Sequence, residues 1–255
     1  MDTAIVSGAS SGMGKEVVLQ LSKRPDPPKE IWAIARNMEK LDEVKKEASS
    51  PVRIVQADLT NPEDIDKIKS LLETEKPKVD FLANLAGFAR FGMPDQISES
   101  DIIDMINLDV RAVVVMTDIT IPYMPEGSCI LQWASVAAFQ PLPAMNVYAA
   151  SKAFVLSYSR ALNNELQEKG ISCTAVCPGW TKTHFLESAK AHDSNGAVTN
   201  YWFAANPDNV VRKALKDGFN HKAMSVYGLP SKIQWFFAKI LPAPFVMLIW
   251  NGIRN

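Results

Sequence analysis

The sequence has few of the residues that bind metal ions or form disulfides. It contains only 3 cysteines and 3 histidines among 255 residues. The cysteines, Cys129, Cys173 and Cys177, are odd in number and lie in apolar segments, which indicates buried thiols in a reducing compartment. The histidines lack the spacing of metal ligands, so we expect no metal site.

The sequence also lacks an excess of charge of either sign and a recognisable targeting segment. The 27 basic and 28 acidic residues leave a net charge of -1, and no stretch is strongly basic. This balance argues against a nucleic-acid-binding surface. The chain enters an apolar run directly after Met1 and Asp2, without the basic region and cleavage site of a signal peptide, so we expect a cytoplasmic protein.

Internal repeats, low-complexity runs and a break that would divide the chain are also absent. The hydrophobic content of 47% is enough for a large core and excludes disorder. The densest turn signal, Pro25-Asp26-Pro27-Pro28, lies too near the N-terminus to separate folding units. We therefore expect a single domain over residues 1–255.

Short apolar runs alternate with stretches of helical periodicity along the chain. The predicted strands are Thr3–Ser7, Ile31–Ala35, Arg53–Gln56, Phe81–Leu85, Ser128–Trp133, Ser172–Val176 and Met224–Tyr227. The predicted helices are Met13–Lys23, Met38–Glu47, Pro62–Glu75, Ile102–Tyr123, Tyr148–Lys169 and Pro207–Asp217. Nearly continuous apolar strands are typical of a parallel sheet covered on both faces. The pattern predicts an α/β fold, a doubly wound parallel sheet in three α/β/α layers (Rossmann arrangement), with ligands at the carboxyl ends of the strands.

A glycine-rich segment follows the first predicted strand. It reads Ser7-Gly8-Ala9-Ser10-Ser11-Gly12-Met13-Gly14 and leads directly into a helix. Glycine permits a tight turn and a close approach to a ligand, and the helix N-terminus offers free N–H groups to a pyrophosphate. The spacing Gly-x-x-x-Gly-x-Gly differs from the common fingerprint Gly-x-Gly-x-x-Gly, and a glycine-rich turn without a ligand is the alternative. The strand–turn–helix context favours a nucleotide site.

Arg36 follows the second predicted strand, at the point where this fold recognises the adenosine ribose. An acidic residue there would hydrogen-bond the ribose of NAD(H), whereas an arginine accommodates the 2′-phosphate of NADP(H). The first carboxylate after the strand is Glu39, so the sequence favours NADP(H) over NAD(H). The alternative interpretation of Arg36 is a solvated surface residue. Asp58 ends the third strand, where its carboxylate either accepts a hydrogen bond from the adenine amino group or caps a turn.

A tyrosine and a lysine lie four residues apart at the start of a long predicted helix. Tyr148 and Lys152 therefore share one helix face, roughly 5–6 Å apart at Cβ. A nearby ammonium favours the phenolate and lowers the tyrosine pKa, so that Tyr148 can exchange a proton near neutral pH. Ser135 ends the preceding strand, where a hydroxyl can hold a carbonyl oxygen. Taken singly, the pair also fits a solvated helix face, and the serine also fits a turn.

Together these segments resemble the short-chain dehydrogenase/reductase family over nearly the whole chain. Ser7–Gly14 is similar to the motif TGxxxGxG with serine for the leading threonine. Asn84–Gly87 is similar to NNAG with leucine for the second asparagine, and Pro178–Thr183 matches PGxxxT. The remaining matches are the four members of the family's catalytic tetrad, Asn107, Ser135, Tyr148 and Lys152.

The resemblance implies an NADP(H)-dependent oxidoreductase that interconverts a ketone and a secondary alcohol. It implies that Tyr148 exchanges the proton, that Lys152 lowers the pKa of Tyr148 and binds the nicotinamide ribose, and that Ser135 orients the substrate oxygen. Asn107 would hold a water that links Lys152 to solvent, and Thr183 would bond the carboxamide. The implied cofactor-binding residues are Gly8, Ser10, Ser11, Gly12, Met13, Gly14, Arg36, Asp58, Leu59, Asn84, Ala86, Gly87, Tyr148, Lys152, Pro178, Gly179, Thr181 and Thr183.

One segment and a set of aromatic and apolar residues point to the substrate. Segment 182–206 lacks strong periodicity and lies where the family keeps its substrate lid. Aromatic and apolar residues that can line the cleft are Phe88, Phe91, Phe139, Leu142, Met145, Phe185, Tyr201, Trp202 and Phe203. They indicate an apolar or bulky substrate, steroid-like or acyl-type, with ordinary core packing as the alternative.

The C-terminal segment 233–255 is rich in large apolar residues. Lys239, Pro242 and Pro244 interrupt it too often for a membrane span. A cover over the substrate cleft, a subunit interface and a peripheral membrane contact are the three readings, and we favour the first two. We expect a homodimer or homotetramer that acts on a small carbonyl or alcohol substrate.

A non-catalytic NADP(H)-binding sensor or scaffold on the same fold is the alternative from another class. Such a protein would lack the equivalent of Tyr148 or Lys152, and both are present. An epimerase or dehydratase also uses Tyr-x-x-x-Lys, but such enzymes usually carry a separate substrate domain on a longer chain.

Overall fold

One parallel sheet of seven strands organises the part of the chain that the structure describes. The computed structural model describes residues 1–193 and 196–254, so Ser194 and Asn195 of the predicted lid and Asn255 of the C-terminal segment lie outside the described residues. The strands are β1 (Thr3–Ser7), β2 (Glu30–Ala35), β3 (Val52–Gln56), β4 (Val79–Asn84), β5 (Cys129–Trp133), β6 (Ser172–Val176) and β7 (Met224–Ser225). They lie in the order β3-β2-β1-β4-β5-β6-β7, and all neighbouring strands are parallel.

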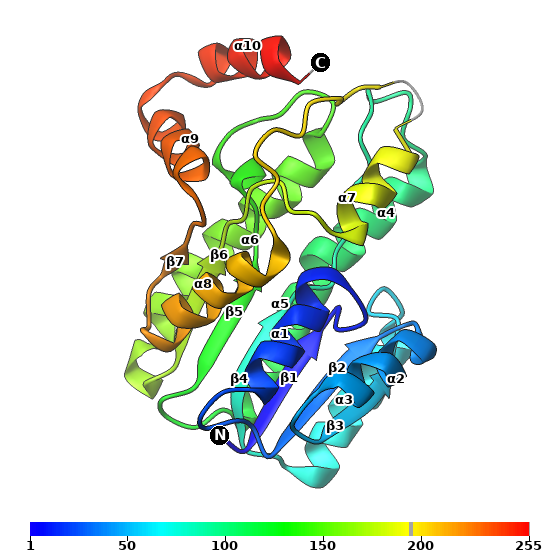
Figure 1. Cartoon of the computed structure of the whole chain (residues 1–255), viewed down its shortest axis with the longest axis vertical. Helices are drawn as coiled ribbons and strands as arrows, with labels where there is room; N and C mark the ends of the chain where they lie inside the picture. Colours follow the sequence, from blue (N-terminus) through cyan, green and yellow to red (C-terminus); the bar gives the residue numbers. More distant parts are fainter. Residues whose placement is uncertain (194–195, 255) are drawn as a thin grey trace.

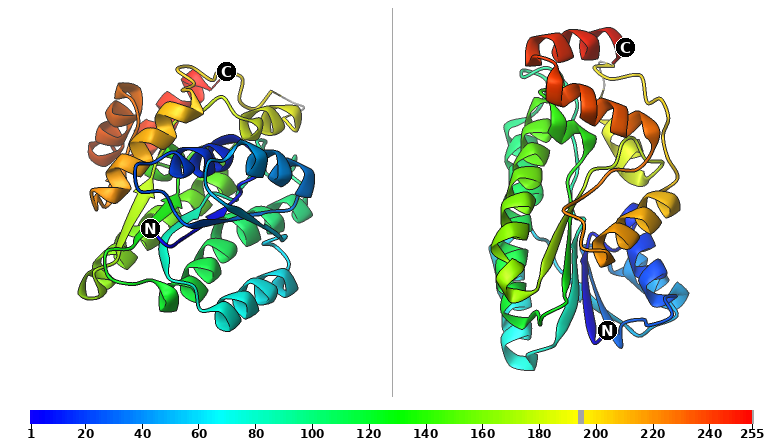
Figure 2. Two further views of the ribbon diagram at one scale, coloured as in Figure 1. Left: turned by 60° about the horizontal axis from the view of Figure 1, so that its bottom comes forward. Right: turned by 90° about the vertical axis from the view of Figure 1, so that its left-hand side faces the viewer.

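Helices cover both faces of this sheet and complete three layers (Figure 1). They are α1 (Gly12–Ser22), α2 (Met38–Glu47), α3 (Pro62–Glu75), α4 (Glu99–Ile106), α5 (Ala112–Thr120), α6 (Asn146–Glu165), α7 (His184–Ala191), α8 (Pro207–Phe219), α9 (Leu229–Ile240) and α10 (Ala243–Ile253). Helices α1, α2 and α8 lie on one face, and α3, α5 and α6 on the other (Figure 2). The strand order reverses between β1 and β4, which places a ligand crevice at their carboxyl ends. The structure confirms the doubly wound α/β fold.

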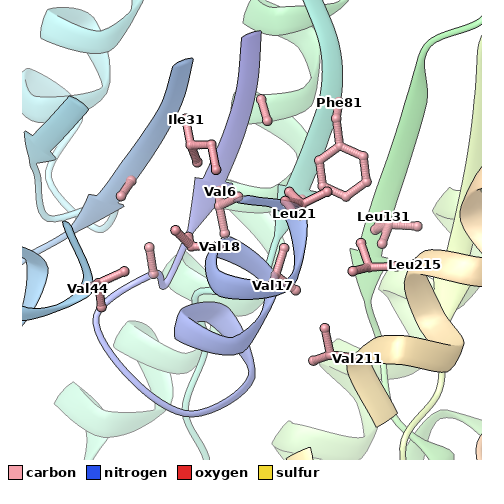
Figure 3. Packing of buried hydrophobic residues seen from close by; sticks show 14 of the residues in the cluster. Val6, Val17, Val18, Leu21, Ile31, Val44, Phe81, Leu131, Val211 and Leu215 are labelled. Atoms are coloured by element: carbon pink, nitrogen blue, oxygen red, sulfur yellow. The ribbon is translucent and has the colours of Figure 1, made fainter. Parts of the chain in front are cut away.

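The apolar strands explain why helices cover both faces of the sheet. Successive side chains of a strand point to opposite sides, so Val6 of β1 enters the core shared with α1 and α8, and Ile5 enters the core shared with α3 and α5. Figure 3 shows side chains of the first core: Val6, Val17, Val18, Leu21, Ile31, Val44, Phe81, Leu131, Val211 and Leu215. This packing holds α1, and with it the glycine-rich turn, against the end of β1.

The structure differs from the prediction around the long helix expected at Ile102–Tyr123. There the chain forms α4, a π-helix (Asn107–Arg111), α5 and a 3-10 helix (Ile121–Tyr123) in succession. A π-helix takes more residues per turn than an α-helix, so side chains after α4 point in directions that a continuous α-helix would not give. Segment 182–206 contains α7, and the C-terminal segment forms α9 and α10, which Pro242 separates.

A buried network of polar side chains joins two central strands to helix α5. The Nδ2 atom of Asn84 donates to Thr117 Oγ1 at 3.1 Å and to Gln132 Oε1 at 3.0 Å. Gln132 Nε2 also donates to Thr117 Oγ1, at 2.8 Å. All three side chains are buried. The network therefore fixes the carboxyl ends of β4 and β5, from which the site loops leave, against the helix layer.

Replacing Asn84 tests this network. Asn84→Ala leaves the buried Gln132 oxygen without its donor, and we expect a loss of about 1–3 kcal/mol in the free energy of unfolding. Urea denaturation of the wild type and the variant measures the change. Asn164→Ala, at an exposed position of α6, is the control and should leave the midpoint nearly unchanged. An equal midpoint for Asn84→Ala and the wild type would show that the network contributes little.

Candidate active site

A cleft of about 1450 Å³ lies at the carboxyl ends of the strands. The loops that follow β1 to β6 all contribute to its walls, and α9 and α10 close one side. In Figure 1 these two helices lie beyond the carboxyl ends of the strands, away from the N-terminus. The cleft has the position that the predicted fold assigns to its ligand.

The glycine-rich turn forms one wall of this cleft with its backbone. Gly8 has a φ of +68°, and a Cβ there would lie 2.8 Å from the backbone nitrogen of Ala86. A Cβ on Gly14 would overlap the carbonyl oxygen of Gly8. The side chain of Ser11, the residue before α1, makes no capping hydrogen bond, so the first N–H groups of α1 face the cleft without a side-chain acceptor. Such a turn fits a pyrophosphate, because free N–H groups and the helix dipole favour an anion.

One end of the cleft carries cationic side chains beside a carboxylate. The Arg36 side chain is 74% exposed, and its Nη1 lies 3.6 Å from Asp58 Oδ2. Asp58 also accepts hydrogen bonds from the backbone N–H and the hydroxyl of Thr60, so it caps a turn and lines the cleft at once. Burial acts to raise the pKa of Asp58, but the Thr60 bonds and the Arg36 charge outweigh it and lower the pKa. Lys40, which the sequence analysis did not single out, lines the same end.

Ser135, Tyr148 and Lys152 meet in the cleft near the end of β5. Tyr148 and Lys152 lie one turn apart on α6, and the Lys152 Nζ is 5.6 Å from the Tyr148 ring centroid. The same Nζ donates to the carbonyl oxygen of Trp133 at 3.2 Å. The Ser135 hydroxyl acts on the Tyr148 phenol and lowers its pKa. A hydroxyl, a phenol and an ammonium thus face one space, which is the arrangement needed to bind and protonate a substrate oxygen.

The phenol of Tyr148 has an electrostatic environment that the sequence did not predict. Burial raises its pKa above the ordinary value of 10.0, the nearby Asp109 carboxylate raises the pKa further, and the Ser135 hydroxyl lowers it. The net direction is upward, against the expectation that Lys152 lowers the pKa. The spacing on α6 indicated the ammonium correctly, but it could not reveal a carboxylate from another helix.

That carboxylate stands where the sequence analysis expected Asn107 to act. Among the described residues it is Asp109, two positions further along the π-helix, that contacts Lys152, with Oδ1 3.7 Å from Nζ. Asn107 does not line the cleft. Asp109 is fully buried, and burial raises its pKa to about 6, although Lys152 and the N–H of Phe88 oppose this rise. The aspartate was missed because a π-helix changes which side chains face inward.

The cleft gathers most of the predicted site residues. Those that line it are Gly8, Ser10, Ser11, Gly12, Met13, Gly14, Arg36, Asp58, Leu59, Ala86, Gly87, Ser135, Tyr148, Lys152, Pro178, Gly179, Thr181 and Thr183. Asn84 and Asn107 are the two that do not. Asn84 belongs instead to the buried network between β4, β5 and α5, so its side chain supports the cleft from behind.

The lid and the C-terminal helices form an apolar end of the cleft. The Phe185 ring lies 5.8 Å from that of Tyr148. Trp250 of α10 donates from Nε1 to the carbonyl oxygen of Pro143 at 2.9 Å, and the carbonyl of Arg254 accepts from two N–H groups of the lid. The apolar and aromatic residues lining this end are Leu142, Met145, Trp180, Phe185, Trp202, Phe203, Phe237, Phe245, Ile249 and Trp250.

Some aromatic residues expected in the cleft lie outside its lining. Phe91 is buried and packs edge-on against Trp180, with ring centroids 6.0 Å apart. Phe139 and Tyr201 pack in neighbouring apolar clusters. The outer faces of α9 and α10 leave Phe236 and Leu248 exposed. None of the described helices is both long and apolar enough to cross a membrane.

Comparison with known proteins agrees with this geometry. A family model described as short chain dehydrogenase matches residues 2–194. The chain is 33% identical over 199 residues to a very-long-chain 3-oxoacyl-CoA reductase of Anas platyrhynchos. This alignment covers 73% of this chain and 62% of the relative. It is 32% identical over 183 residues to a 17-beta-hydroxysteroid dehydrogenase type 3 of Mus musculus. This second alignment covers 69% of this chain and 58% of the relative.

A solved structure also resembles this chain over its whole length. A short-chain dehydrogenase from Sphingobium yanoikuyae, in complex with NADPH, aligns with a TM-score of 0.79 and 26% identity, and the alignment covers 100% of this chain and 97% of that chain. The two curated relatives are longer, and the chain spans less than two thirds of the length of each.

Proposed function

Because the chain belongs to the short chain dehydrogenase family of oxidoreductases, we propose that it transfers a hydride between NADP(H) and a ketone or secondary alcohol. The observation that carries the proposal is the placement of Ser135, Tyr148 and Lys152 in the same cleft as the glycine-rich turn. A proton donor and a dinucleotide cradle in one space are the two parts that a carbonyl reduction needs.

The residues along the cleft fit a phosphorylated dinucleotide. The turn from Gly8 to Gly14 offers backbone N–H groups to a pyrophosphate. Arg36 and Lys40, at the mouth of the same cleft, offer cations to a 2′-phosphate. Lys152 and Thr183 also line the cleft, where they would hold the nicotinamide ribose and carboxamide. The NADPH complex of the Sphingobium relative supports this assignment.

The protein manages the proton of the reaction. When bound, NADP(H) supplies the hydride to a carbonyl carbon or takes it from an alcohol carbon. In reduction the Tyr148 phenol donates its proton to the substrate oxygen, and in oxidation the phenolate takes that proton back. Ser135 holds the same oxygen by a hydrogen bond and fixes its distance from Tyr148. The raised pKa of Tyr148, caused first by burial, keeps the phenol in the form that a reductase needs.

We propose an apolar, bulky substrate. The lid at 182–206 and the C-terminal helices present mostly apolar side chains to the end of the cleft beyond Tyr148. The relatives named as a very-long-chain 3-oxoacyl-CoA reductase and a 17-beta-hydroxysteroid dehydrogenase both have names that describe compounds with a large apolar part, an acyl chain or a steroid. A steroid-like ketone or an acyl ketone is the class that this lining favours.

Replacing Arg36 tests the cofactor. Arg36→Ala removes a guanidinium that would bind the 2′-phosphate, and we expect NADPH affinity to fall about tenfold or more, because a hydrogen bond to a charged group is worth about 1.5–3 kcal/mol. NADH affinity should change little. Fluorescence titration of both cofactors measures the preference, with Arg160→Ala, an exposed arginine on α6, as the control. Equal wild-type affinities for NADPH and NADH would overturn the assignment.

Replacing Tyr148 tests the chemistry. Tyr148→Phe keeps the ring and removes the proton donor, so NADPH should still bind while turnover falls about 100-fold or more. The assay follows NADPH absorbance with a panel of steroid ketones, acyl ketones and small ketones. Tyr158→Phe, ten residues further on the same helix, is the control and should retain activity. A Tyr148→Phe protein that keeps most of its kcat would refute the role of the phenol. A wild type that binds NADPH and turns over none of the panel would favour the non-catalytic alternative.

Replacing Trp250 tests the apolar wall. Trp250→Ala removes a side chain that packs in the cluster around Leu142, Met145 and Tyr148, and we expect KM for a bulky ketone to rise about tenfold or more, since a buried apolar side chain is worth about 1.5–3 kcal/mol. KM for a small ketone and NADPH affinity should change less. Leu248→Ala, 67% exposed on the same helix, is the matched control. An equal rise in KM for small and bulky ketones would contradict a substrate-binding role for α10.

A further inference from the structure

A buried carboxylate lies beneath the reaction site. Asp109 comes from the π-helix Asn107–Arg111 and is 0% exposed. Its Oδ1 accepts a hydrogen bond from the Phe88 N–H at 3.2 Å and lies 3.7 Å from Lys152 Nζ. Its Oδ2 is buried and has no hydrogen-bond partner among the described residues. An ionised carboxylate in such a place is costly unless a charge balances it, and Lys152 provides that charge.

The backbone at Gly87 approaches both members of this pair closely. A Cβ on Gly87 would lie 2.5 Å from Asp109 Oδ1 and 3.3 Å from Lys152 Nζ. The loop after β4 therefore packs directly on both charged groups through a residue without a side chain. On the other side, the Trp133 carbonyl at the end of β5 accepts from Lys152. The ammonium is thus held between a carboxylate and a carbonyl oxygen.

Among residues 1–193 and 196–254, few charged groups act on Asp109. The titratable side chains that act on it or respond to it are Lys152 and Tyr148, both from α6. From the loop after β4, only the backbone N–H of Phe88 contributes among the described residues. Because no solvent reaches the carboxylate, its effect on the other two groups is weakly screened.

We propose that Asp109 is a positioning residue of the proton-transfer site, whose carboxylate restrains and balances the Lys152 ammonium and so determines how readily Tyr148 releases its proton. The inference rests on the proposed function and adds to it a residue outside the substrate's reach. An ammonium alone would draw the phenol toward its phenolate, whereas an ammonium paired with a carboxylate does so much less. A neutral amide at this position would leave the ammonium unbalanced.

The consequence is a phenol that stays protonated to higher pH than an unbalanced ammonium would allow. In reduction the Tyr148 O–H bond breaks, its proton goes to the substrate oxygen, and the hydride goes to the carbonyl carbon. This requires a protonated phenol, and the Asp109 charge extends the pH range over which the phenol stays protonated. In oxidation the phenolate must form first, so the same charge moves that activity to higher pH.

Replacing the carboxylate with its neutral isostere tests the inference. In Asp109→Asn, the midpoints of the pH–rate profiles should move down by about one unit or more, because one negative charge near the phenol is removed. The rate of reduction should then begin to fall, and the rate of oxidation to rise, at lower pH than in the wild type. Since burial places the pKa of Asp109 at about 6, the two profiles should converge below that pH. Asp104→Asn, an exposed carboxylate on α4, is the control and should leave both profiles in place. Unchanged profiles for Asp109→Asn would overturn the proposal.

A second measurement does not need turnover. Tyrosinate absorbance of a protein minus that of its Tyr148→Phe counterpart reports the phenolate of Tyr148 alone. We expect this phenolate to form at lower pH in Asp109→Asn, and in a second neutral variant, Asp109→Ser, than in the wild-type background. Equal midpoints in all backgrounds would refute the role of Asp109. If the wild type turned over no carbonyl substrate, the proposed function would fail while this titration still decided the inference.

Discussion

The buried ion pair between Asp109 and Lys152 is the interaction on which the arrangement of the site depends. It joins the π-helix that follows α4 to helix α6, and both groups press against the backbone at Gly87. Three segments distant in sequence are therefore held in one place by two charges. The cost of burying either charge alone is high, so neither helix can shift without exposing an unpaired group. Tyr148 lies on α6 one turn from Lys152 of this pair.

The sheet supplies the frame in which this pair can form. Its parallel strands end together, so the loops after β1, β4 and β5 converge. Ser7 at the end of β1 accepts hydrogen bonds from the N–H groups of Leu85 and Ala86, and these bonds tie the glycine-rich turn to the loop that packs on the ion pair. Behind that loop, the Asn84 network fixes β4 and β5 to α5. Side-chain hydrogen bonds thus tie the glycine-rich turn and the loop beside Asp109 and Lys152 to the sheet.

The sequence predicted the fold well, and it predicted those parts of the site that depend on local spacing. Continuous apolar strands and helical periodicity indicated the doubly wound sheet, and Tyr148 and Lys152 share a face because four residues separate them on an α-helix. Asp109 could not be found in this way, because the direction of its side chain depends on a π-helix that the hydrophobic periodicity did not predict. Asn84 was expected in the cleft, but the pairing of β4 with β5 turns its side chain into a buried network. The upward pKa of Tyr148 depends on burial, which spacing does not report.

The ionisation of Asp109 is the quantity that tests this account most directly. Carbon-13 NMR of protein labelled at the aspartate carboxyl carbons, with the Asp109 resonance assigned from its absence in Asp109→Asn, follows that carboxylate through a pH titration. A fully buried group balanced by one ammonium should titrate with a pKa of about 6. A carboxyl group that stays protonated throughout the pH range of activity would carry no charge to balance Lys152, and the Asp109–Lys152 pair would then not control Tyr148.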